Sequence, residues 1–81
     1  MVKVTDEAGK KALCDRLARV EGQLRGLQKL IQAEAESEKV AQQMTAARKA
    51  LDKAFFALVA TLIAEGQVDS DEVATILLRF A

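Results

Sequence analysis

The sequence contains no proline, tryptophan, tyrosine or histidine, and it has one cysteine. Because proline breaks helices, its absence argues against a loop-rich chain and favours long helices. Without histidine, the chain lacks the usual general base and the commonest metal ligand. A single cysteine cannot form an internal disulfide or a multi-thiolate metal site within one chain. These absences predict a reduced, cytoplasmic protein that is not a conventional enzyme and holds no cofactor.

The length of 81 residues predicts one domain, residues 1–81, and the composition of 51% hydrophobic and 30% charged residues is typical of a globular protein. A domain of this size buries a small core, so we expect it to associate with copies of itself. Residues 1–12 lack the apolar segment of a signal peptide, and the longest apolar stretch, residues 54–64, is too short to span a bilayer. We therefore expect no membrane partner.

The charged residues are segregated, although twelve Lys and Arg balance twelve Asp and Glu. Residues 10–29 carry six basic groups and two acidic ones, whereas residues 64–72 carry four acidic groups and no basic one. Such asymmetry at zero net charge indicates a polar partner on one side of the molecule. The alternative is a solvated helix face.

Apolar residues repeat at alternating steps of three and four along two long segments, which predicts two long helices. The first helix is expected over about 6–35, with Thr5 as its N-cap, and the second over about 38–65, with Ser37 as its N-cap. Gly66 is expected to end the second helix. The expected seams are Leu13, Leu17, Val20, Leu24, Leu27 and Ile31 in the first helix, and Val40, Met44, Ala47, Leu51, Ala54 and Leu58 in the second.

A short third helix is expected over about 69–81, because Asp69 and Glu72 have the spacing of a capping box. From Phe55 to Ile63 the apolar positions spread around the whole second helix, so we expect another subunit to cover it. The predicted fold is all-α: a three-helix protomer with two long antiparallel helices and a short C-terminal one. Two such hairpins would pair into a four-helix bundle.

Basic residues on the two long helices are the best candidates for a binding surface. Near the middle of the hairpin they would form a joint patch suited to phosphate contacts; they are Arg16, Arg19, Arg25, Arg48 and Lys53. Gly22 and Gly26 each destabilise a helix by about 1 kcal/mol relative to Ala, so we interpret them as allowing close approach of another backbone. The alternative is tolerated surface glycine. Cys14 is expected to be a small buried hydrophobe.

Two motifs carry a resemblance to a known family. The segment Arg16–Gly26 (RLARVEGQLRG) and the segment Gln43–Lys53 (QMTAARKALDK) closely resemble the helix-one and helix-two motifs of the copper-sensing operon repressor family, the CsoR/RcnR type of bacterial metal- and stress-responsive repressors. The order and separation of the motifs also match, over roughly residues 8–66. The resemblance implies a dimer of dimers, binding to double-stranded operator DNA without a helix-turn-helix, and repression relieved by an inducer.

The sequence departs from the family at the inducer site. The family's Cu(I) sensors place Cys, His and Cys at positions that correspond here to Ser37, Leu62 and Gly66. These residues cannot hold a soft Cu(I) ion, so we expect no metal at this site. The leading hypothesis is a homotetrameric DNA-binding repressor without the Cu(I) site. The alternative is a helical oligomerisation module that has lost operator binding or acts through mixed oligomers.

Overall fold

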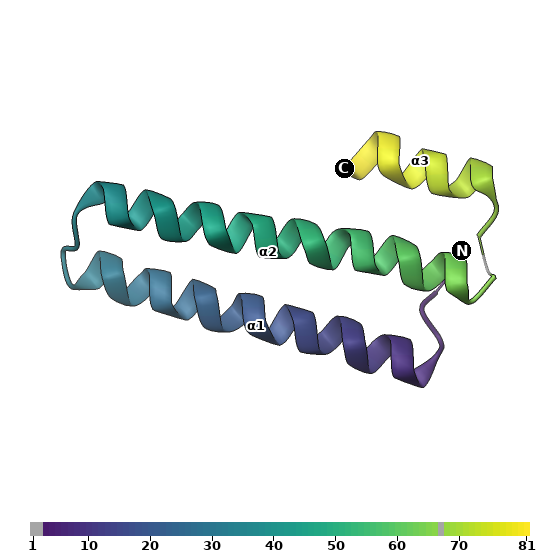
Figure 1. Ribbon diagram of the computed structural model, residues 1–81, viewed down its shortest axis with the longest axis horizontal. Coiled ribbons are helices and arrows are strands. Elements are labelled where there is room, and N and C mark those ends of the chain that lie inside the picture. Colours follow the sequence, from purple (N-terminus) through teal and green to yellow (C-terminus); the bar gives the residue numbers. More distant parts are fainter. Residues whose placement is uncertain (1–2, 67) are drawn as a thin grey trace.

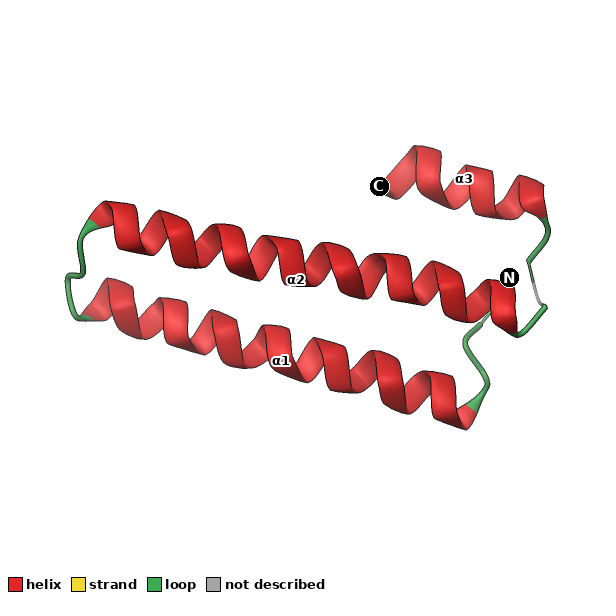
Figure 2. Ribbon diagram, in the orientation of Figure 1, coloured by secondary structure: helices red, strands yellow, loops and turns green. Residues whose placement is uncertain are grey.

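The computed structural model describes residues 3–66 and 68–81, which form the α-helices α1 (Glu7–Gln32), α2 (Ser37–Ala64) and α3 (Ser70–Phe80). Helices α1 and α2 lie side by side in an antiparallel hairpin, and α3 lies along α2 on the side away from α1 (Figure 1). The described part of the chain contains no strand (Figure 2). The all-α fold with two long helices and a short third one is therefore confirmed.

The ends of α1 and the start of α2 differ from the sequence prediction. The N-cap of α1 is Asp6 instead of Thr5, because the Asp6 carboxylate accepts a hydrogen bond of 2.8 Å from the Gly9 N–H. α1 ends at Gln32, three residues earlier than expected. Ser37 is the first residue of α2, and the N-cap is Glu36, whose side chain makes no capping hydrogen bond. Glu34, in the turn between the two helices, has φ 57°. Because this left-handed conformation does not fit an α-helix, the turn determines where α1 ends and where α2 begins.

The end of α2 and the start of α3 agree with the sequence prediction. Gly66 has φ 68°, a left-handed conformation that glycine adopts without strain, and it terminates α2. The Asp69 side chain accepts a hydrogen bond of 2.8 Å from the Glu72 N–H and caps α3. Local sequence therefore determines the connection between the two helices.

A narrow stripe of residues repeating every seven positions holds the hairpin together. Val20 and Leu27 of α1 and Ala47 and Ala54 of α2 are the buried residues of this contact, with Ala54 only 2% exposed. Thr5 hydrogen-bonds to Glu65, and a Cβ on Gly9 would touch Thr61, which fixes the antiparallel register at one end. Continued along the helices, this register places Arg19 opposite Leu51 and Lys53 opposite Leu17.

Most of the other half of each predicted seam is exposed to solvent, whereas Leu58 is half-buried. Leu24 is 47% exposed and Leu51 is 50% exposed, although they were expected to be buried in the seam. Leu24 lies four residues after the buried Val20, and Leu51 lies four residues after the buried Ala47, so each lies on the same flank of its own helix. In an antiparallel pair these two flanks face the same side of the hairpin. One side of the hairpin therefore carries an apolar face made of Leu17, Leu24, Ile31, Met44 and Leu51.

The strongly apolar end of α2 is covered on one side by the chain itself. Val59 and Leu62 are buried, and Leu62 lines a groove together with residues of α3. Phe56, at 54% exposed, and Ile63 stay open. Because α3 lies along one side of α2, the open side, which includes Phe56 and Ile63, remains for the second subunit that the sequence predicts.

The protomer exposes more surface than a compact monomer of its size. Its accessible surface is 6209 Å², whereas a folded monomer of this mass exposes about 4800 Å². Its radius of gyration is 15.7 Å, compared with about 12 Å for a compact domain of this length. None of the helices in the described residues has the length and apolarity needed to cross a membrane. The excess surface includes the apolar face, so we expect a second copy to cover that face.

We predict that Leu24→Glu dissociates the assembled protein, because a buried charge without a partner costs several kcal/mol. The matched control is Ala18→Glu, which places the same charge on the exposed outer side of α1. Light scattering at micromolar concentration should show a smaller mass for Leu24→Glu alone. A monomeric mass for the unmodified protein would contradict the prediction.

Candidate nucleic-acid interface

Basic side chains gather on the side of the hairpin opposite the apolar face. Arg19 directly precedes the buried Val20, and Lys53 directly precedes the buried Ala54, so both residues lie on this second flank. Arg16 is exposed and lies four residues before the buried Val20, on the side of the buried stripe away from Leu24. Lys49 lies one turn before Lys53. We call these four exposed residues, Arg16, Arg19, Lys49 and Lys53, the basic face.

Two glycines extend the basic face along α1. Gly26 directly precedes the buried Leu27, and Gly22 lies one turn earlier on the same side of the helix. A Cβ added at either position would meet no atom within 4 Å. Packing within the protomer therefore does not require either glycine. Open space therefore lies beside both glycines on the side of α1 that carries Arg19.

The residues of the basic face form no ion pair in the part of the chain that the structure describes. Two nearby acids, Asp15 and Glu21, pair with other basic residues. The Lys11 Nζ donates a hydrogen bond of 2.9 Å to Asp15, and this bond, together with the attraction between the charges, raises the pKa of Lys11. Glu21 lies 4.0 Å from Arg25. The basic face is therefore free to attract an anionic partner.

Two of the five candidate binding residues lie away from the basic face. Arg25 lies on the outer side of α1, within reach of Glu21. Arg48 directly follows the buried Ala47, which places it toward the flank of α2 that carries the apolar face. The structure therefore brings together Arg16, Arg19 and Lys53, whereas Arg25 and Arg48 point to other sides of the hairpin.

The three positions that the sequence resemblance aligns with the family's Cu(I) ligands lie at the two ends of α2. Ser37 begins the helix, and Leu62 is buried near its end, about 38 Å away at 1.5 Å per residue. Gly66 follows the helix and is exposed. Neither a hydroxyl nor an aliphatic side chain suits Cu(I). Among the described residues, no three His, Cys, Asp or Glu side chains form a metal-binding group. The residues present therefore do not fit the metal.

Cys14 is exposed, which corrects the expectation that it is a small buried hydrophobe. The residue lies beside Leu13 on the helix, but its side chain falls outside the narrow contact with α2. The apolar periodicity did not predict this exposure. Helix α1 contacts α2 through only one edge of its apolar stripe, and Cys14 lies on the other side of that stripe.

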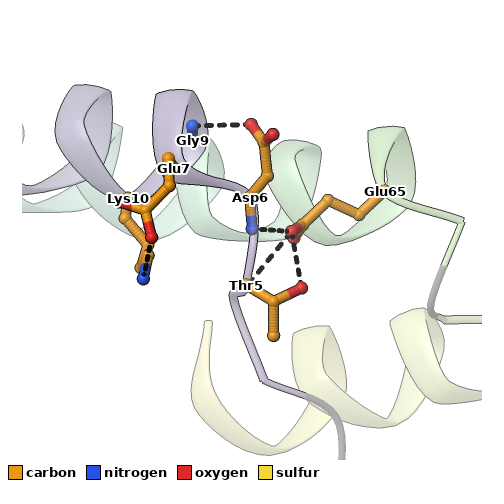
Figure 3. A network of polar contacts seen from close by, with 6 residues as sticks. All are labelled: Thr5, Asp6, Glu7, Gly9, Lys10 and Glu65. Atoms are coloured by element: carbon orange, nitrogen blue, oxygen red, sulfur yellow. Dashed lines mark hydrogen bonds and ion pairs between the residues drawn. The ribbon is translucent and has the colours of Figure 1, made fainter.

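One polar cluster could not be foreseen from the sequence. The Glu65 carboxylate accepts hydrogen bonds from Thr5 and from the backbone of Asp6 (Figure 3). Beside it, a groove of about 1410 Å³ runs between α2 and α3, with Phe55, Leu62 and Ile76 among its apolar walls. Because Thr5 and Glu65 are sixty residues apart, no local motif marks their contact.

Comparison with protein families identifies the family of this chain. The family described as "Metal-sensitive transcriptional repressor" matches residues 9–77, which include the hairpin and most of α3. Comparisons with curated proteins and with solved structures gave no match. Since the match spans far more than half of the chain, this protein belongs to the metal-sensitive transcriptional repressor family of the CsoR/RcnR type.

Proposed function

We propose that this chain is a DNA-binding repressor that holds duplex DNA against its basic face and does not respond to Cu(I). The proposal rests mainly on one observation. Arg16, Arg19 and Lys53 lie on one flank of the hairpin and form no ion pairs among the described residues. Arg and Lys side chains provide most phosphate contacts in protein–DNA complexes. Membership of a repressor family supports the same function.

The partner that suits this surface is double-stranded DNA. The three aromatic residues of the chain are Phe55, Phe56 and Phe80, and all three lie outside the basic face. Binding of single strands usually requires aromatic residues on which bases stack. A surface with glycines next to arginine instead suits the sugar-phosphate backbone of a duplex. Gly22 and Gly26 would let that backbone approach α1 closely.

The assembled form that we propose is a pair of hairpins joined through the apolar face, and further a dimer of dimers. Because the apolar face and the basic face lie on opposite flanks, covering one leaves the other open. A symmetric assembly would also repeat the basic face and so bind a longer stretch of duplex. This supports a homotetramer on operator DNA.

Arg19→Ala is predicted to weaken duplex binding while leaving the helical content unchanged. If Arg19 neutralises one phosphate, the plot of log K against log[salt] should become shallower by about 0.9 in slope when alanine replaces it. The measurement is fluorescence anisotropy with the chain's own upstream DNA at several salt concentrations. Lys53→Ala should behave in the same way.

The matched control for this series is Arg25→Ala, because Arg25 carries the same charge on the outer side of α1. Its effect on DNA affinity should be small. A loss of affinity in Arg48→Ala equal to that in Arg19→Ala would show that the interface extends around α2. Unchanged DNA affinity in both Arg19→Ala and Lys53→Ala would show that the basic face is only a solvated surface, and it would refute the proposal.

Gly26→Ala is predicted to stabilise the folded protein by about 1 kcal/mol, because alanine favours the helix and no atom obstructs its Cβ. Urea denaturation measures this increase in stability. If DNA approaches α1 as proposed, the same substitution weakens duplex binding. A more stable variant with unchanged DNA affinity would show that Gly26 is a tolerated surface glycine.

Copper is predicted to leave the DNA affinity of the unmodified protein unchanged, and Cu(I) should bind weakly in competition with a strong chelator. Combining Ser37→Cys, Leu62→His and Gly66→Cys should create Cu(I) binding if the family positions correspond as proposed. Because Gly66 has φ 68°, Gly66→Ala is the control for the backbone strain that any side chain brings there. Tight copper binding that Cys14→Ala abolishes would contradict the prediction.

A further inference from the structure

Residues 3–6 form an N-terminal arm in which Thr5 and Asp6 donate hydrogen bonds to one carboxylate at the end of α2. The Thr5 N–H and the Thr5 hydroxyl donate hydrogen bonds of 3.0 and 3.3 Å to the Glu65 Oε1. The Asp6 N–H donates to the same oxygen (Figure 3). Hydrogen bonds to an ionised acceptor are stronger than those between neutral groups. Glu65 therefore fastens the arm to a helix that begins more than thirty residues later in the chain.

The arm closes one side of the apolar groove between α2 and α3. Lys3, Val4 and Thr5 line this groove, together with Leu62 of α2 and Ile76 of α3. Helix α3 packs only loosely on the hairpin, whereas α1 and α2 are in contact along their length. The arm therefore forms part of the wall of the groove, and its hydrogen bonds to Glu65 hold that part in place.

One feature of Glu65 favours release of the arm. The second carboxylate oxygen of Glu65, Oε2, is buried and has no hydrogen-bond partner in the described structure. A buried acceptor without a partner is costly, and water would reach it if the arm moved away. Hydration of Oε2 would offset part of the cost of breaking the three hydrogen bonds to Oε1.

Opening would also loosen the first turn of α1. Asp6 donates its N–H to Glu65, and its own carboxylate caps α1 by accepting from Gly9. Gly9 in turn lies so close to Thr61 that an added Cβ would come within 2.7 Å of the Thr61 Cγ2. Movement of the arm is therefore transmitted through Asp6 to α1.

We propose that the N-terminal arm is a strap that Glu65 fastens over the groove between α2 and α3, and that its release exposes the groove and frays the start of α1. The proposal does not depend on DNA binding. It rests on the contacts among the arm, Glu65 and α1.

The first test measures access to the groove with Nile red, an uncharged dye that fluoresces in apolar surroundings. Glu65→Ala should raise the bound fluorescence several-fold over the unmodified protein, and Glu65→Gln should lie between the two. The matched control is Glu38→Ala, which removes a glutamate from the opposite end of α2. Adding Ile76→Gln to Glu65→Ala should abolish the increase, whereas adding Leu78→Gln should not, because Leu78 is 87% exposed and does not line the groove.

The second test is amide hydrogen exchange, measured first on the unmodified protein and then on Glu65→Gln. The Thr5 and Asp6 amides should be protected, and Glu65→Gln should reduce their protection together with that of Gly9 and Lys10. The Val73 amide in α3 should not change. Unprotected Thr5 and Asp6 amides in the unmodified protein would overturn the proposal. So would an increase in Nile red fluorescence that survives Ile76→Gln, or no increase in Glu65→Ala.

Discussion

The contact between α1 and α2 is the interaction on which the other features of this protein depend. It is narrow because small residues occupy it: Ala47 and Ala54 face α1, and the largest buried side chain on α1 is Leu27. Such a contact lets the two helices approach closely along their whole length. It also leaves both flanks of each helix open. The apolar face and the basic face exist as separate surfaces because the antiparallel arrangement directs equivalent flanks to the same side.

This arrangement leaves much of the apolar surface of an isolated protomer exposed. An 81-residue domain has little apolar material for a core, and here much of it lies outside the hairpin contact. Leu17, Leu24 and Ile31 would destabilise an isolated protomer in water relative to an assembled one. Association through the apolar face would satisfy the hydrophobic side chains without covering the arginines and lysines. One side of the hairpin would then stabilise the assembly, and the opposite side would bind DNA.

The end of α2 is the place where the start of α1, the end of α2 and α3 meet. Leu62 is buried there and lines the groove beside α3. Three residues later, Glu65 accepts the hydrogen bonds of the N-terminal arm. Direct hydrogen bonds and apolar packing therefore join these segments. If the sequence resemblance places the family's Cu(I) ligands correctly, this region would differ from the Cu(I) sensors in its chemistry.

The sequence alone determined the helices, the stop at Gly66, the Asp69 cap and the family, because each of these depends on neighbouring residues or on motifs of fixed spacing. It could not determine which half of the apolar stripe faces the partner helix. Val20 and Leu24 are both apolar and four residues apart, and only the packing of α2 buries the first and exposes the second. The same rotation separated Arg19 and Lys53 from Arg48 and left Cys14 exposed. The contact of Glu65 with Thr5 was likewise decided by tertiary structure, since it joins residues that only the folded hairpin brings together.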